Sequence, residues 1–396
     1  MALQSIESLD FEGKRVFVRV DFNVPLTEQG EVGDDTRIRE ALPTLQYILK
    51  QGAKLVLASH LGRPKGKADP ALSLKPVVER LSTLLGRQVA FADDCVGPRA
   101  EEKVAHLKNG EALLLENLRF HAGEEKNDAA FARALAGLGD IYVNDAFGSS
   151  HRAHASVVGM VSHFDQKRAG FLMQKEVEAL SRLRDDAEKP FVLILGGAKV
   201  SDKIGVIRSL LPRIDVMIIG GAMAYTLLKA QGIPVGKSRI EEDQLGEAKK
   251  IFEQARRQSV KILLPEDHTV VEKLEPPTPA SATLGQEIPE DKLGVDIGPK
   301  TIKSFGEALQ EAHTIFWNGP MGVFESPPFD QGTRAVAQAM PSSHGFKVVG
   351  GGDTVAALTQ ANLLERFDHV STGGGASLEF LENGDLPGLA ALRNAG

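Results

Sequence analysis

Segment 346–358, FKVVGGGDTVAAL, combines residue types that could hold a phosphorylated ligand. Its pattern predicts a buried strand that runs into the three glycines at 350–352 and then into the first turn of a helix. Glycines let backbone N–H groups approach an anion closely, and a helix N-terminus adds partial positive charge. Asp353 would repel such a ligand unless a cation lay between them, so we interpret it as a Mg²⁺ ligand. The alternative is that Asp353 or Thr354 only caps the helix.

Two lysines and further glycines in the same half of the chain could bind the same ligand. Lys199 and Lys203 follow Gly196-Gly197 at the end of an expected strand. A spacing of four on a helix would turn both ammonium groups toward one face. The triplet 373–375 forms another glycine turn that could bind an anion or act as a hinge. Together these features favour a polyphosphate ligand.

The first half of the chain instead places arginines and polar side chains where strands are expected to end. The planar fork of an arginine matches phosphate and carboxylate oxygens, so several arginines at one edge indicate a small, strongly anionic substrate. Any one of them alone could be a solvated surface charge. The histidines lack a partner at metal-binding spacing, and we assign them to hydrogen bonding or packing. The residues are Asp21, Asn23, Arg37, His60, Arg63, Arg119, His151, Arg152 and His154. Arg37 is expected on a flexible loop after the first strand.

The elements that must position these side chains follow the pattern of an α/β protein with parallel sheets. Short aliphatic runs alternate with Ala/Leu-rich helical segments, and no half-buried alternation dominates. The expected strands are 15–20, 54–58, 88–91, 112–115 and 141–143 in the first half, and 191–195, 216–219, 261–264, 314–317, 347–349 and 369–370 in the second. Ligands of such sheets bind outside the carboxyl ends of the strands.

With 396 residues, the chain is too long to fold around one ordinary hydrophobic core. We therefore expect two doubly wound, Rossmann-like domains, residues 1–184 and 185–385, with the helical segment 171–184 as connector and the active site in the cleft between the domains. Segment 275–279, EPPTP, is expected to be a surface loop.

Composition limits the functional classes. The formal net charge of −7 argues against sequence-independent binding to nucleic acid. We find neither a long apolar run nor a signal peptide, so we expect a cytoplasmic protein without a membrane partner. The single cysteine, Cys95, is expected to be a buried thiol and leaves no disulfide framework.

Two motifs resemble nucleotide-binding signatures and fail on spacing. Segment 232–238, GIPVGKS, has three residues between its glycines where a P-loop needs four. The glycines of 350–352 are followed by Val355, so the third small residue of a dinucleotide-binding motif is missing. These departures argue against a dehydrogenase.

The order of the motifs along the chain resembles the phosphoglycerate kinase family from end to end. The motifs are VDFNVP at 20–25, DDTRI at 34–38, SHLGRP at 59–64, ENLRF at 116–120, DAFGSSHRAHAS at 145–156, GGAKVSDKI at 196–204, WNGPMGVFE at 317–325, GGGDT at 350–354 and TGGGAS at 372–377. The resemblance implies reversible phosphoryl transfer between ATP with 3-phosphoglycerate and ADP with 1,3-bisphosphoglycerate, in glycolysis, with Mg²⁺ bound to the nucleotide. It also implies a monomer.

Residue by residue, the resemblance implies three groups. The triose-binding group is Asp21, Phe22, Asn23, Arg37, His60, Leu61, Gly62, Arg63, Arg119 and Arg152. The nucleotide-binding group is Lys203, Gly294, Glu325, Gly351, Gly352, Asp353 and Thr354, with Asp353 on the metal. The groups that act on the transferring phosphoryl are Arg37, Lys199 and Gly374.

One departure, Ala222, stands where the family often has a third glycine near the base and ribose, and it could alter nucleotide affinity. The resemblance also implies that residues 386–396 return to the first domain. The alternative function is a non-catalytic sensor of phosphorylated metabolites, which predicts the loss of Lys199, Arg37 or Asp353. All three are present.

Overall fold

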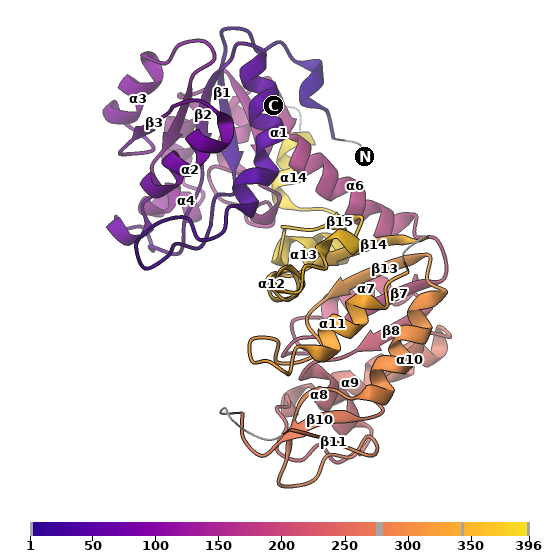
Figure 1. Cartoon of the computed structure of the whole chain (residues 1–396). Helices are drawn as coiled ribbons and strands as arrows, with labels where there is room; N and C mark the ends of the chain where they lie inside the picture. The colour runs from indigo at the N-terminus through magenta and orange to yellow at the C-terminus, as the bar shows by residue number, and fades with distance from the viewer. Residues whose placement is uncertain (1–2, 275–279, 342–343, 394–396) are drawn as a thin grey trace. The chain divides into compact units, whose positions relative to one another are not determined.

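The computed structural model describes residues 3–274, 280–341 and 344–393 (Figure 1). The surface loop expected at 275–279 lies outside these residues. Among the helices described, none combines the length and the apolar character needed to cross a bilayer.

The chain divides into two compact units, Met1–Glu178 with Asp385–Gly396, and Ala179–Gly384. The division falls inside helix α6 (Phe171–Asp185), before the 184/185 boundary expected from the sequence. The expected boundary follows the end of the helical pattern, whereas packing divides the helix itself. In its last turns, the Arg182 guanidinium lies 4.2 Å from the ring centroid of Phe346, within the second unit.

The first unit is built on a six-stranded parallel sheet in the order β3-β4-β2-β1-β5-β6. Its strands are β1 (Arg15–Val20), β2 (Lys54–Ala58), β3 (Val89–Ala92), β4 (Ala112–Leu115), β5 (Ile141–Asp145) and β6 (Lys167–Ala169). Its helices and 3₁₀ turns are η1 (Ile6–Ser8), α1 (Thr36–Lys50), η2 (Pro70–Leu72), α2 (Lys75–Leu85), α3 (Pro98–Ala105), η3 (Leu118–Phe120), α4 (Ala122–Glu125), α5 (Ala129–Ala136), η4 (Phe147–Ser149), η5 (Gly159–His163) and α14 (Pro387–Arg393). Apolar side chains of α1 and α2 pack on one face of the sheet, and those of α3 and α5 pack on the other.

The second unit contains another six-stranded parallel sheet, in the order β15-β14-β13-β7-β8-β9. Its strands are β7 (Phe191–Leu195), β8 (Val216–Ile219), β9 (Lys261–Leu263), β13 (Thr314–Asn318), β14 (Phe346–Gly350) and β15 (His369–Val370). Its helices and 3₁₀ turns are α7 (Ile204–Leu210), α8 (Met223–Ala230), η6 (Glu242–Gln244), α9 (Leu245–Arg257), α10 (Pro299–Gln310), α11 (Gln331–Gln338), α12 (Gly352–Gln360), η7 (Leu364–Arg366) and α13 (Gly375–Asn383). Side chains of α10, α11 and α12 form the core on one face of this sheet.

The expected α/β class with two parallel sheets is confirmed, and every strand expected from the sequence is present. Sequence reasoning missed four short strands. One is β6, a charged edge strand with no apolar run. The others form a small antiparallel sheet in the order β11-β10-β12, with β10 (His268–Val271), β11 (Ser281–Ala282) and β12 (Leu293–Ile297). These three strands are short and are interrupted by polar residues or glycine (HTVV, SA and LGVDI), so none of them forms an aliphatic run.

Strand β5 ends in Asp145, a buried carboxylate that accepts a hydrogen bond from the backbone N–H of Met173 at the start of α6 (3.1 Å). Burial raises the pKa of Asp145 from its usual 3.8 to about 6, although the N–H of Met173 opposes the shift. Between these values the folded chain binds more protons than the unfolded chain. This carboxylate therefore makes the wild type lose stability as the pH rises through that window.

We expect Asp145→Asn to remove this dependence. The free energy of unfolding of the variant minus that of the wild type should increase from about pH 4 to pH 6, by at most about 1.4 kcal/mol per pH unit, and then level off. Urea denaturation at a series of pH values measures this difference, in which groups that titrate alike in both proteins cancel. A difference that stays constant over the series would show that Asp145 titrates normally.

Candidate active site

At the carboxyl end of β1, Asp21 holds Arg37. The Arg37 Nη1 lies 2.8 Å from Asp21 Oδ1, and the Asp21 carboxylate also accepts hydrogen bonds from Asn23 N (3.2 Å) and Ser149 Oγ (3.3 Å). Ser149 follows β5, the neighbour of β1 on the side where the strand order reverses. Such a reversal is where open parallel sheets bind ligands.

The sequence predicts Arg37 on a loop, and this prediction is wrong. Arg37 lies in the first turn of α1. Burial alone would raise the pKa of Asp21. The cations Arg37 and Arg19 and the ring of His60 outweigh burial and lower that pKa well below its usual value. Asp21 is therefore an anion at every ordinary pH. Its charge holds the guanidinium of Arg37 close to it, and the Arg37 side chain is 34% exposed.

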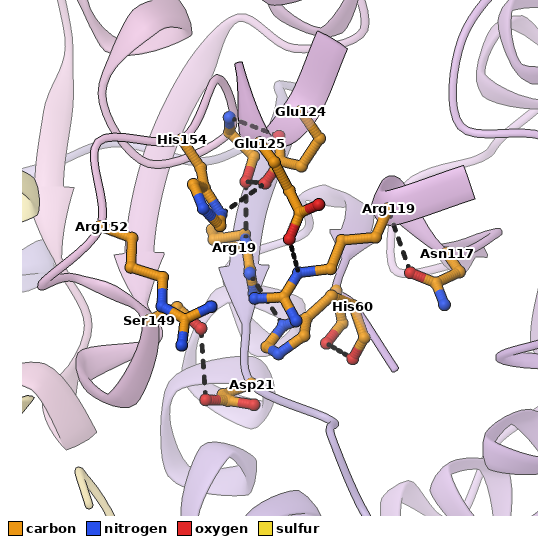
Figure 2. Close-up of polar contacts among 12 residues, drawn as sticks. Arg19, Asp21, His60, Asn117, Arg119, Glu124, Glu125, Ser149, Arg152 and His154 are labelled. Atoms are coloured by element: carbon orange, nitrogen blue, oxygen red, sulfur yellow. Dashed lines mark hydrogen bonds and ion pairs between the residues drawn. The ribbon is translucent and has the colours of Figure 1, made fainter. Parts of the chain in front are cut away.

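Several further cations meet beside Asp21 (Figure 2). Arg119 on η3 is almost buried, and its Nη1 donates to the carbonyl of Gly62 (2.8 Å), while its Nε has no hydrogen-bond partner among the described residues. Burial, together with the charges of Arg19 and Arg152, lowers the pKa of Arg119 to about 10. Like charges held this close to one another are the arrangement expected of an anion-binding site.

Sequence reasoning missed Arg19, the buried arginine at the centre of this group. Its place within a strand, VFVRV, gave no signal of a role. Its Nε donates to Ser156 Oγ (2.9 Å), and its Nη2 lies 3.1 Å from His60 Nδ1. An arginine only donates, so Nδ1 of His60 accepts and the proton of the neutral ring is on Nε2. Burial and the neighbouring arginines keep the pKa of His60 well below its usual value.

Glu124 was also missed, and it anchors this group through Ser156. Its side chain is fully buried, and its two oxygens accept hydrogen bonds from Ser156 Oγ (2.6 Å) and Ser156 N (2.9 Å). Ser156 Oγ in turn accepts a hydrogen bond from Arg19 Nε, so Glu124 is linked to Arg19 through the hydroxyl of Ser156. His154 Nδ1 lies 3.8 Å from Glu124. Burial and Arg119 lower the pKa of His154 to about 4, so this contact joins a neutral ring to the carboxylate near pH 7.

We expect Glu124→Gln to destabilise the protein by about 1–3 kcal/mol, because a buried cation and hydroxyl lose a charged partner. The neighbouring Glu125 is the matched control. Its carboxylate is 40% exposed and 3.7 Å from Arg119 Nε, so Glu125→Gln should change stability by less than about 0.5 kcal/mol. Denaturant unfolding of both variants compares them, and equal effects would show that Glu124 does not anchor the group.

Four other residues of the expected triose-binding group serve core packing or loop geometry in the structure. Phe22 and Leu61 are buried in the core, so their side chains face other apolar groups. Asn23 Oδ1 accepts from Gly62 N (2.9 Å), which joins the loops after β1 and β2. Gly62 has φ +62°, and a Cβ there would lie 2.6 Å from Leu72.

The two remaining arginines of the expected triose group lie on loops at the same edge of the sheet. Arg63 is exposed on the loop that follows β2. Arg152 is half-buried on the loop after η4, and its Nε donates a hydrogen bond to His151 Nε2 (3.1 Å).

The second unit has a cavity of about 330 Å³ at the carboxyl ends of β7, β13 and β14. It lies where the strand order reverses, between β7 and β13. The N-terminal residues of α12 and α13, both nine-residue helices, form part of its wall and direct N–H groups and partial positive charge into it. Its lining is Gly196, Gly197, Ala198, Lys199, Asp202, Lys203, Asn318, Gly319, Pro320, Gly351, Gly352, Asp353, Thr354, Gly374, Gly375 and Leu378.

Lys199 and Lys203 both line this cavity, but not for the reason predicted. Helix α7 begins at Ile204, so the two lysines lie on the preceding loop and not one turn apart on a helix. The loop can pass close to the neighbouring one because Gly196 has no side chain: a Cβ there would lie 2.2 Å from the carbonyl of Pro320. Burial lowers the pKa of Lys203, although the carboxylates of Asp202 and Asp353 favour its charged form.

Asn318 is a cavity residue that sequence reasoning missed, although it stands inside the quoted WNGPMGVFE motif. Its Oδ1 accepts a hydrogen bond from Lys203 Nζ. Its Nδ2 is buried and has no partner among the described residues, which leaves a donor available for an oxygen-rich ligand.

The structure decides against the capping alternative for Asp353. Gly351, with φ +92°, is the N-cap of α12, and the cap has no side-chain hydrogen bond. Thr354 Oγ1 instead accepts from Gly319 N (2.6 Å) and ties the helix to the loop after β13. Within the described residues Asp353 has no hydrogen bond or ion pair, so its exposed carboxylate is available to a cation at the cavity.

Two expected nucleotide-binding residues lie outside the cavity lining. Gly294 is on β12, where a Cβ would lie 2.2 Å from Tyr225 Oη, and Glu325 is exposed on the loop after β13. The expected glycine Gly374, by contrast, lies in the wall, with φ +57°, as the N-cap of α13.

Comparison with known proteins identifies the family of the chain. The model of the family described as phosphoglycerate kinase matches residues 6–384. The chain belongs to the phosphoglycerate kinase family. A phosphoglycerate kinase of Koribacter versatilis is 55% identical over 402 residues, with all of both chains covered. One from Anaeromyxobacter dehalogenans is 54% identical, with 99% of each chain covered.

Solved structures of phosphoglycerate kinases share the fold. The structure from Coxiella burnetii has a TM-score of 0.87 at 41% identity, with 98% of each chain covered. The structure from Pyrococcus horikoshii has the same TM-score at 33% identity, with 99% of this chain and 98% of that chain covered. The resemblance and the two-domain fold class expected from the sequence are therefore confirmed.

Proposed function

We propose that the chain catalyses reversible phosphoryl transfer between Mg-ATP with 3-phosphoglycerate and Mg-ADP with 1,3-bisphosphoglycerate, as a cytoplasmic, monomeric glycolytic enzyme. Family membership supports the reaction. The single structural observation that carries it is the contrast between the two units: crowded arginines beside Asp21 in one, and a glycine-lined cavity with Lys203 and Asp353 in the other.

The cation cluster of the first unit suits the triose. Burial and the charges of Arg19 and Arg152 disfavour the charged form of Arg119, and a bound phosphate would offset this effect. The neutral His60, with its proton on Nε2, and the Asp21 carboxylate can bond hydroxyl groups of the substrate. Arg63 and Arg37 are exposed enough to reach the same anion.

The cavity of the second unit suits a nucleoside polyphosphate. Backbone N–H groups at Gly351 to Asp353 and at Gly374 can donate to phosphate oxygens, and Lys203 and the free Nδ2 of Asn318 add donors. The exposed Asp353 fits the Mg²⁺ that accompanies such a ligand, because carboxylate oxygens are the ligands Mg²⁺ prefers. Bound Mg²⁺ would neutralise oxygens of the phosphate groups.

The reaction requires little covalent chemistry from the side chains of the protein. The acceptor is a carboxylate that is already deprotonated at pH 7, so no general base is needed. The residues bring the acceptor and the γ-phosphoryl in line and offset the charge on its oxygens, with Lys199 and Arg37 as the two side chains that do so. Transfer therefore requires the ligands of the two units to meet.

A coupled assay of ATP consumption tests the proposal. Turnover should require both 3-phosphoglycerate and Mg²⁺, and omission of either should reduce it to background. Binding of both ligands without any turnover, at saturating Mg²⁺, would instead support the sensor.

A further inference from the structure

Asp94, Cys95 and His121 form a cluster that takes no part in the functions proposed above. Asp94 and Cys95 follow β3, and His121 ends the η3 turn that follows β4. Strands β3 and β4 are parallel neighbours, so the two loops meet at one edge of the sheet. One potential ligand atom of each residue lies within 4.8 Å of those of the other two.

Two of the three side chains are already held in place. Asp94 Oδ1 accepts hydrogen bonds from His121 Nε2 (2.6 Å) and from Cys95 N (2.7 Å). The ring of His121 also stacks on Phe131, with centroids 5.3 Å apart. The side chains of Asp94 and His121 are 38% and 35% exposed, whereas Cys95 is fully buried. The cluster is therefore open to solvent on one side and closed by a thiol on the other.

We infer that this cluster binds a thiophilic divalent transition-metal cation such as Zn²⁺. Thiolate, imidazole and carboxylate are the donors that Zn²⁺ takes, at about 2.0–2.3 Å, and a tetrahedral site with those bonds separates its ligand atoms by roughly 3.3–3.8 Å. Asp94 Oδ1 and His121 Nε2 are 2.6 Å apart, and no two of the three ligand atoms are more than 4.8 Å apart, so side-chain rotations can bring all three to that spacing. Water from the exposed side is the fourth ligand, as in sites with three protein ligands.

The chemistry of the thiol selects this class of cation. Thiolate sulfur is a soft donor that favours Zn²⁺ over hard cations, and a bound cation that replaces the thiol proton also offsets the negative charge of the adjacent Asp94 carboxylate. Mg²⁺ prefers oxygen ligands, so the ion expected near Asp353 does not compete. Because His121 ends the turn that carries Arg119, the bound cation also fixes that turn.

Titration of the full chain with Co²⁺, a spectroscopic substitute for Zn²⁺, tests the inference. Cys95 is the only cysteine of the chain, so near-ultraviolet thiolate-to-cobalt absorption has a single source. We expect this absorption to saturate at one equivalent, to persist in excess Mg²⁺ and to vanish in Cys95→Ala. Asp94→Asn and His121→Gln should weaken Co²⁺ binding at least about tenfold. Asp93→Asn is the matched control, since Asp93 is adjacent and 67% exposed, and it should bind as the wild type does.

Saturation with Co²⁺ without thiolate absorption would overturn the inference, because the ion would then lie elsewhere. Unchanged affinity in both Asp94→Asn and His121→Gln would overturn it equally, since the thiol would then bind the ion without the cluster. These two variants alter half-exposed side chains, so they decide the question even if Cys95→Ala fails to fold.

Discussion

Replacement of Arg37 by alanine is expected to lower kcat by roughly 10³, by analogy with arginines that stabilise a transferring phosphoryl group. Arg63, Arg119 and Arg152 remain to bind the ground-state phosphate, so KM for 3-phosphoglycerate should change little. The structure alters the reason for this prediction. Arg37 acts from the first turn of a helix, positioned by the Asp21 carboxylate 2.8 Å away, and not from a mobile loop. Steady-state kinetics with saturating Mg-ATP measures both constants.

Two further variants make this test specific. Arg39 lies two positions along the same helix, pairs with Asp35 and is 54% exposed, so Arg39→Ala should leave kcat within about twofold. Arg37→Lys keeps the charge and loses the planar fork, so it should recover only part of the rate. If KM rises in Arg37→Ala while kcat is unchanged, Arg37 is a binding residue and does not act on the transition state.

Replacement of Asp353 by asparagine is expected to raise the Mg²⁺ concentration for half-maximal turnover by at least about tenfold, because a charged ligand to the cation is lost. Stability should change by less than about 0.5 kcal/mol, since the Asp353 carboxylate is exposed and makes no hydrogen bond or ion pair within the described residues. Turnover measured over a range of Mg²⁺ at fixed ATP gives the first quantity, and urea denaturation gives the second.

Asp202 provides the matched control, because it lines the same cavity with an exposed carboxylate. Asp202→Asn should leave the Mg²⁺ dependence nearly unchanged. If Asp202→Asn shifts it and Asp353→Asn does not, the cation is held by Asp202 and not by Asp353. If neither variant shifts it, the phosphates alone hold the metal and the assignment of Asp353 is wrong.

The fold class and the positions of the main strands could be predicted because they depend on local pattern. A buried parallel strand must be apolar on both faces, so β1, β7 and β13 appear as short aliphatic runs whatever lies around them. The glycine turns at 350–352 and 373–375 were also recognisable, because a backbone that must approach an anion or adopt positive φ excludes side chains. The short edge strand β6 and the sheet β11-β10-β12 were not, because polar residues and neighbouring strands define them.

Within the candidate site, the sequence by itself determined which charged residues stand at strand ends, because a change from an apolar run to arginine, aspartate or glycine is visible in one dimension. Only the tertiary structure decided what each charge meets. Arg19 and Glu124 become partners through Ser156 because strands and loops far apart in the chain converge there. Lys199 and Lys203 share a cavity because two loops pack backbone to backbone, and not because of helical spacing. Burial, hydrogen-bond partners and pKa shifts belong to such three-dimensional contacts, and residue order along the chain does not contain them.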